Sequence, residues 1–159
     1  RQWGSDHESR WLDAEYVSRA AGREMLYHRR RFEFFRDGVY WLLTDYAGYS
    51  GDACPSTLSV HFHFSSIPVE LDGLTARTTF ENGTNLAVFP LREGKQSRGM
   101  TAELRQGWIS PRYGVREQAP VLRYRCLQCE MTPIKTVLLL YQSEAELQSR
   151  IRVVKGSLH

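Results

Sequence analysis

Short apolar runs with β-strand character follow one another along most of this chain, and two-residue turn signals separate several of them. The turn signals are polar residues followed by glycine, and they are Asp37-Gly38, Asp72-Gly73, Asn82-Gly83 and Glu93-Gly94. Such pairs favour tight hairpin turns between antiparallel strands. Short strands at regular intervals, without long helices between them, are typical of sandwiches and barrels. The sequence therefore predicts an all-β fold, an antiparallel β-sandwich.

The expected strands begin only after a polar, mixed segment of 22 residues, in which Trp3, Trp11 and Tyr16 are possible anchors. They cover residues 24–36, 39–45, 57–65, 69–71, 74–80, 85–91, 99–104, 121–127 and 135–142. The helical candidate covers residues 143–149, and its Ser143-Glu144-Ala145-Glu146 start resembles a capping box. With so little helix, we expect the strands to build the core.

Length and composition fit one globular domain spanning residues 1–159, because hydrophobic residues make up 42% of the 159. No apolar run approaches the roughly 20 residues that a membrane-spanning helix needs. The formal charge of +3 permits an anionic ligand without requiring one. Nucleic acid is not an expected partner, because a binding groove would need more basic residues with aromatic residues among them. The chain starts at Arg1 without methionine, so we expect a processed chain or a fragment of a larger protein.

The three cysteines do not form a recognisable metal motif. Cys126 and Cys129 form a lone CxxC, and Cys54 cannot supply the second pair that a zinc ribbon needs. Two free thiols and a local disulfide in a loop are the two interpretations, and neither indicates a cellular compartment.

Two histidines lie two residues apart in the apolar run from Val60 to Phe64. Because side chains alternate along a strand, His61 and His63 face one side and the apolar residues face the other. Alternation cannot distinguish the two imidazoles from each other, since they point the same way.

A third histidine and an aspartate can be placed by the register of a hairpin. A turn at Asp37-Gly38 makes paired residue numbers sum to 75, so Asp45 lies opposite Arg30. His28 is then a diagonal neighbour of Asp45 on the same face, with Cα atoms roughly 7–8 Å apart. These two side chains could reach one metal ion, and an imidazole from the 60–64 run would complete a three-ligand site suited to zinc. An Arg30–Asp45 ion pair and hydrogen-bonded histidines are the structural alternative.

Several of these motifs resemble a known family in their order and spacing. In the heparinase II/III-like polysaccharide lyases, a strand with His-Arg precedes a strand that ends in aspartate, and a Phe-His-hydrophobic strand follows. Residues 27–32, 39–45 and 62–64 resemble these three elements. The similarity extends from about Ser5 to Tyr141 through weaker matches at residues 5–8, 67–73, 107–114 and 136–140.

The resemblance implies that this chain is the C-terminal β-sandwich region of a larger lyase with an upstream α-helical toroid. Such enzymes cleave uronate-containing acidic polysaccharides, including glycosaminoglycans, by β-elimination. By resemblance, a structural zinc would be bound by His28, Asp45 and His63, with His61 as the alternate ligand. A periplasmic or secreted bacterial location is expected on the same grounds.

Other site residues follow less directly. Arg29, Arg31 and Tyr113 are candidate substrate-binding residues, and Tyr49 is a candidate for a catalytic tyrosine. Much of the cleft would come from the helical toroid, so this chain alone is expected to be inactive. The alternative function is a non-catalytic carbohydrate-binding or scaffold module, in which exposed aromatic residues such as Trp41 and Trp108 stack on sugar rings.

Overall fold

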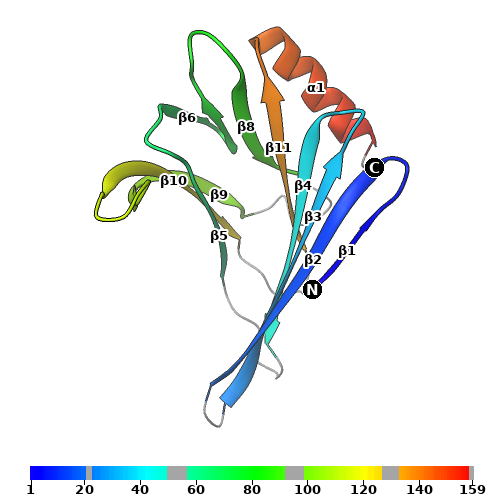
Figure 1. Ribbon diagram of the computed structural model, residues 1–159. Coiled ribbons are helices and arrows are strands. Elements are labelled where there is room, and N and C mark those ends of the chain that lie inside the picture. Colours follow the sequence, from blue (N-terminus) through cyan, green and yellow to red (C-terminus); the bar gives the residue numbers. More distant parts are fainter. Residues whose placement is uncertain (21–22, 50–56, 92–98, 127–132, 158–159) are drawn as a thin grey trace.

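The computed structural model describes residues 1–20, 23–49, 57–91, 99–126 and 133–157, which form two antiparallel sheets and one helix. In spatial order, the large sheet consists of β1 (Gln2–Ser5), β2 (Ser9–Ala20), β3 (Arg23–Phe35), β4 (Tyr40–Tyr49), β11 (Ile134–Tyr141), β8 (Asn85–Pro90), β7 (Thr75–Thr78) and β6 (Val69–Asp72). The small sheet consists of β5 (Leu58–His63), β10 (Glu117–Cys126) and β9 (Thr101–Ile109). The predicted all-β sandwich is confirmed (Figure 1).

The main core lies between the small sheet and one half of the large sheet. Leu122 and Tyr124 on β10 are fully buried and pack against Ala76 and Val88 of the large sheet. The Tyr124 hydroxyl lies 2.7 Å from the carbonyl oxygen of Leu74 and 3.0 Å from that of Val88. This side chain therefore joins the two sheets by both packing and hydrogen bonding.

Helix α1 (Glu144–Ser157) covers the opposite face of the large sheet (Figure 1). Its buried residues Leu147 and Val154 pack against Val137 and Leu139 of β11. The predicted helix start is capped: Glu146 N lies 3.3 Å from Ser143 Oγ, and Glu146 Oε2 accepts from the backbone N–H of Gln142, the residue before Ser143, at 2.8 Å. The helix is longer than the expected 143–149, because packing on the sheet outweighs the weak helix propensity of its β-branched second half. No helix in the described ranges is both long and apolar enough to cross a membrane.

The sequence-based assignment was wrong at the N-terminus, where the mixed segment forms β1 and all of β2. Its alternating charged and aromatic residues pair with β3: Asp13 binds Arg29, and the Trp11 ring lies 4.7 Å from the Arg31 guanidinium carbon. Such cross-strand pairs stabilise a strand that lacks a continuous apolar face. The expected strand 99–104 was also too short, since β9 continues to Ile109.

The β3–β4 hairpin has the predicted register. Phe35 pairs with Tyr40 and Arg30 pairs with Asp45, so the paired numbers sum to 75. In the turn, a Cβ atom on Gly38 would lie 2.4 Å from the Tyr40 ring, so only glycine fits without movement of that ring. The Arg150 guanidinium of α1 donates to the carbonyl oxygen of Gly38. The C-terminal helix therefore holds the tip of the hairpin that carries the candidate site.

Candidate functional site

His28, Arg30 and Asp45 form one cluster on the β3–β4 hairpin, as the register predicted. Arg30 lies opposite Asp45, and His28 lies two residues away from Arg30 along β3, on the same face. That face points toward the small sheet, because Ile134, the β11 partner of Asp45, packs against Val60 of β5. We refer to these three residues as the His28–Arg30–Asp45 cluster.

The Asp45 carboxylate is the centre of the cluster, and Asp45 is only 1% exposed. Arg30 donates from Nε to Oδ1 at 2.7 Å and from Nη2 to Oδ2 at 3.0 Å. His28 Nε2 lies 2.9 Å from the same Oδ1. A buried carboxylate is tolerated only where its charge is compensated and its oxygens are hydrogen-bonded, and this paired arrangement meets both needs.

The imidazole of His28 connects this buried carboxylate with the surface. Its side chain is 42% exposed. When Nε2 donates to Asp45, a neutral ring keeps Nδ1 as an acceptor. A carboxylate behind a histidine fixes both the ring orientation and the tautomer. His28 can therefore present an oriented acceptor to a proton, a polar ligand or a cation.

The other two histidines lie on the small sheet and face away from this cluster. Val60 and Phe64 point into the core, so alternation places exposed His61 and His63 on the outer face. Nowhere in the described part of the chain do three or more His, Cys, Asp or Glu side chains form a group that could hold a metal ion. Of the three implied zinc ligands, the structure brings together only His28 and Asp45. Zinc stays a prediction from the resemblance, and no chemical step is assigned to it.

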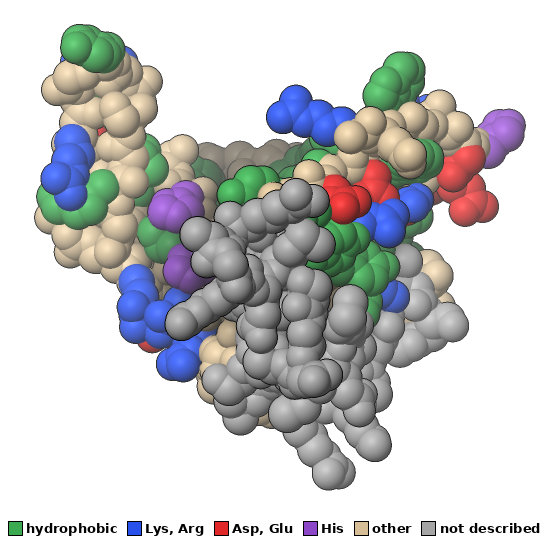
Figure 2. Space-filling view, turned by 90° about the horizontal axis from the view of Figure 1, so that it is seen from below, with side chains coloured by type: hydrophobic (Ala, Val, Ile, Leu, Met, Phe, Trp, Pro, Cys, Tyr) green, Lys and Arg blue, Asp and Glu red, His purple; other side chains and the backbone are tan. Residues whose placement is uncertain are grey.

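The outer face of the small sheet is basic around these histidines. Figure 2 shows histidine side chains beside a group of Lys and Arg on this side of the molecule. His61 pairs with Arg123, whose guanidinium binds Glu103, and Arg105 Nε lies 2.8 Å from the same carboxylate. Partial burial, with Arg123 and His63 nearby, lowers the pKa of His61 below its usual value. A neutral imidazole is therefore favoured there at neutral pH.

The candidate substrate-binding residues do not gather around the cluster. Arg29 and Arg31 face the opposite side of the large sheet, where Arg29 binds Asp13 and Arg31 Nη2 donates to Glu33 at 2.9 Å. Tyr113 is fully exposed in the loop between β9 and β10. The side chain of Tyr49 lies outside the described residues, as do Cys54 and Cys129. Cys126 is buried, and burial raises the pKa of its thiol to about 11.

The sequence-based search missed Asp13 because it assigned no strand to the segment around it. The available signal was the alternation of Trp11, Asp13 and Glu15, which complements the arginines at positions 29 and 31. The Asp13–Arg29 ion pair joins β2 to β3 on the face opposite the cluster. This pairing explains the position of the Arg29 side chain without a bound ligand.

This pair should make stability depend on pH in acid. The Arg29 guanidinium holds the pKa of the Asp13 carboxyl below its ordinary value of 3.8. The folded state therefore binds fewer protons, so the stabilisation is complete above the unfolded-state pKa and is lost as pH falls through the lowered folded-state pKa. Asp13→Asn should flatten the decline of unfolding free energy between about pH 5 and pH 2, measured by urea unfolding. Asp72→Asn, which removes a carboxylate at the exposed end of β6, is the control for the loss of one surface charge. Equal slopes for wild type and Asp13→Asn would contradict this assignment.

Comparisons with known proteins agree with the fold described above. The sequence matches the family described as heparinase II/III-like, C-terminal, over residues 4–152. A comparison with curated protein sequences found no match. Among solved structures, heparan sulfate lyase HepC from Pedobacter heparinus is 18% identical with a TM-score of 0.70, over 90% of this chain and 21% of that one.

Two other solved structures give similar values. A heparinase III with methylated lysines is 19% identical with a TM-score of 0.70, over 92% of this chain and 21% of its own. A further crystal structure of heparinase III is 16% identical with a TM-score of 0.69, over 91% of this chain and 21% of its own. This chain thus spans about one fifth of the length of each solved structure.

The fold and the family match together define a β-sandwich domain of the polysaccharide lyase class. The chain belongs to the heparinase II/III-like family and corresponds to its C-terminal part.

Proposed function

We propose that this chain is the C-terminal β domain of a lyase that cleaves uronate-containing acidic polysaccharide by β-elimination. In that reaction a base removes the proton α to the uronate carboxylate, a carbon–carbon double bond forms, and the glycosidic C–O bond breaks. An acid then protonates the leaving oxygen. The domain supplies one wall of the cleft, with the His28–Arg30–Asp45 cluster as its polar centre.

The family match over residues 4–152 carries this proposal. The chemistry of the cluster supports it, because Asp45 and Arg30 neutralise each other and leave His28 as the solvent-facing group. An oriented imidazole can hydrogen-bond to a sugar hydroxyl or carboxylate. The names of the similar structures indicate heparan sulfate as the first substrate to test.

The lyase activity is expected in the longer polypeptide and absent from the 159-residue chain. The longer polypeptide, incubated with heparan sulfate and with non-sulfated uronate polysaccharides, should produce the ultraviolet absorbance of the unsaturated uronate. The 159-residue chain should produce none, because one wall alone does not enclose a substrate. If the longer polypeptide yields no such product from any uronate polysaccharide, the lyase proposal fails. Binding of glycans without turnover, and regardless of their charge, would instead favour the carbohydrate-binding module.

We further propose, from the family resemblance, that the domain binds a structural zinc near His28 and Asp45. Metal analysis of the purified chain should then find about one zinc per molecule, with His28→Ala lowering that content. His63→Ala and His61→Ala form a matched pair of controls, and neither is expected to lower the zinc content, because both imidazoles face away from the cluster. A wild-type chain without zinc, or a His28→Ala chain with full zinc content, would exclude the metal.

A further inference from the structure

Within the described residues, no second layer lies over the β1–β4 part of the face that forms the sandwich core. The small sheet has three strands and packs over the β6–β8 side of the large sheet, where Ala76 and Val88 contact Leu122 and Tyr124. Strands β1 to β4 extend beyond it, as Figure 1 shows. Their surface on this side is continuous with the buried core.

Two rows of apolar side chains cross this uncovered region in register. One row runs from Leu43 through Phe32 and Leu12 to Trp3, and the other from Leu138 through Trp41 to Phe34. Exposure rises steadily along the first row, from 2% at Leu43 to 38% at Phe32, 46% at Leu12 and 83% at Trp3. Trp3, Leu12 and Phe32 are exposed and Phe34 and Trp41 are half-buried, and we call these five residues the aromatic face.

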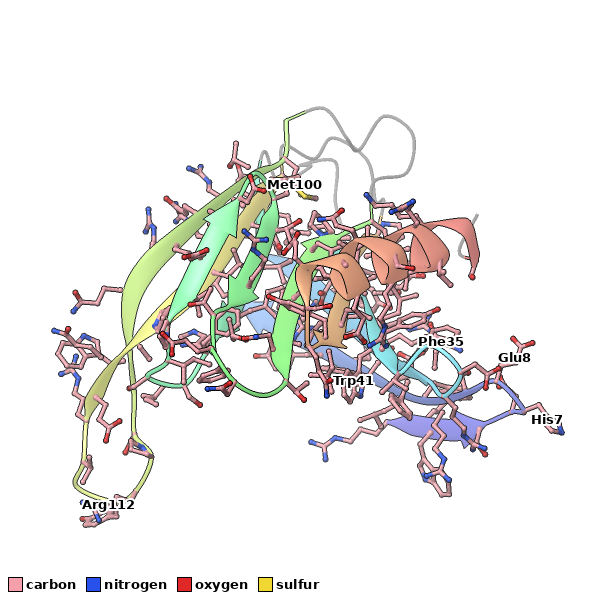
Figure 3. The ribbon with its side chains drawn as sticks, turned by 90° about the horizontal axis from the view of Figure 1, so that it is seen from above. His7, Glu8, Phe35, Trp41, Met100 and Arg112 are labelled. Carbon is pink, nitrogen blue, oxygen red and sulfur yellow. The ribbon has the colours of Figure 1, made fainter. Side chains whose placement is uncertain are left out.

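The aromatic face has the shape of a groove. It lines a depression of about 700 Å³, in which the Phe34 and Trp41 ring centroids lie 5.2 Å apart. Figure 3 shows Trp41 between the β9–β10 loop, marked by Arg112, and the β1–β2 turn, marked by His7 and Glu8. Exposed apolar surfaces of this kind mark interaction sites.

The occupant that best fits this groove is another layer of β structure. The rows are the outward continuation of an established sheet–sheet interface, against which Leu138 is packed and partly buried, so the same packing would bury Trp3 and Trp41. Strand β5 is an edge of the small sheet within the described ranges, so further strands can be added there. The solved structures that this chain matches are about five times longer, so similar domains occur within much longer chains.

We propose that the aromatic face is covered in the parent lyase by additional β-strands from outside residues 1–159, which extend the small sheet past β5. This proposal rests on the proposed function only in assigning the chain to a longer polypeptide. The covering layer would also lie on the same face of the large sheet as His28.

Tryptophan-selective chemical labelling, analysed by mass spectrometry, tests the proposal directly. Trp3 and Trp41 should label about tenfold more slowly in the longer polypeptide than in the 159-residue chain, because labelling follows solvent access. Trp108, which is 45% exposed on the small sheet, is the internal control and should change little. Unchanged labelling of Trp3 and Trp41 in the longer polypeptide would overturn the proposal.

A matched pair of variants separates packing from misfolding. Phe32→Asp should restore fast labelling of Trp3 in the longer polypeptide, while the 159-residue chain keeps its circular dichroism spectrum. Val153→Asp, which replaces an exposed apolar residue on α1, should leave the labelling unchanged. If Phe32→Asp leaves Trp3 protected in the longer polypeptide, the proposal is wrong.

The other possible occupants give different results. Protection of Trp3 in the 159-residue chain that rises with protein concentration would identify a second copy, and protection by added heparan sulfate oligosaccharide would identify a sugar site. Either result would overturn the proposal.

Labelling does not require catalysis, so a longer polypeptide that protects Trp3 but lacks lyase activity would refute only the proposed function. An active lyase with an exposed Trp3 would refute only the covering layer.

Discussion

Replacing Asp45 with alanine is expected to lower the free energy of unfolding by about 2–4 kcal/mol. The substitution removes the carboxylate that accepts two hydrogen bonds from Arg30 and one contact from His28. Arg30 would be left without its counter-charge, although its 30% exposed side chain lets water recover part of the loss. Urea unfolding at neutral pH, followed by circular dichroism, measures the change.

Two control variants test whether the loss of stability in Asp45→Ala comes from the burial of the carboxylate and from its pairing with Arg30. Glu144→Ala removes a carboxylate that lies 2.9 Å from Arg77 but is 58% exposed, and it should cost no more than about 0.5 kcal/mol. The double variant Arg30→Met with Asp45→Leu should recover most of the stability, because no unpaired charge is left. A cost for Asp45→Ala as small as that for Glu144→Ala would show that the cluster contributes little to folding.

Tyr124→Ala should cost about 3–5 kcal/mol, because it creates a cavity between the two sheets. Tyr124 is fully buried, and its hydroxyl reaches the carbonyl oxygens of Leu74 and Val88. Tyr124→Phe keeps the ring and leaves those carbonyl oxygens without this donor, so it should cost about 1–2 kcal/mol. The same urea unfolding experiment separates the contribution of the ring from that of the hydroxyl.

Tyr113→Ala provides the matched control, because Tyr113 is fully exposed. Its unfolding free energy should differ from wild type by less than about 0.5 kcal/mol. Equal stabilities for Tyr124→Ala and Tyr113→Ala would contradict the assignment of Tyr124 to the inter-sheet core.

The β3–β4 hairpin could be predicted from sequence because its turn is short and its pairing is local. Placing Asp37-Gly38 in the turn determined that Arg30 faces Asp45 and that His28 shares their face. The N-terminal strands could not be predicted in this way. Their stability comes from pairs such as Asp13–Arg29, which depend on a partner strand rather than on apolar alternation within their own sequence.

The position of His63 shows that the candidate site, like the N-terminal strands, could be predicted from sequence only in part. Alternation correctly placed His61 and His63 on the side opposite Val60 and Phe64. It could not show which side faces the large sheet, since that depends on how two sheets pack across a long sequence separation. Apolar packing turned Val60 inward and the imidazoles outward, so the histidines of β5 lie on a different surface from Asp45.

Strand β11 lies between β4 and β8, yet it comes last in sequence order among the described strands. During synthesis, β4 and β8 each have one unpaired edge until residues 134–141 leave the ribosome. Pairings between distant segments form slowly, and open strand edges promote aggregation in the meantime. Nascent chains of this domain should therefore depend on chaperones until β11 has emerged, and a chain that terminates before β11 should lose the whole large sheet rather than one edge.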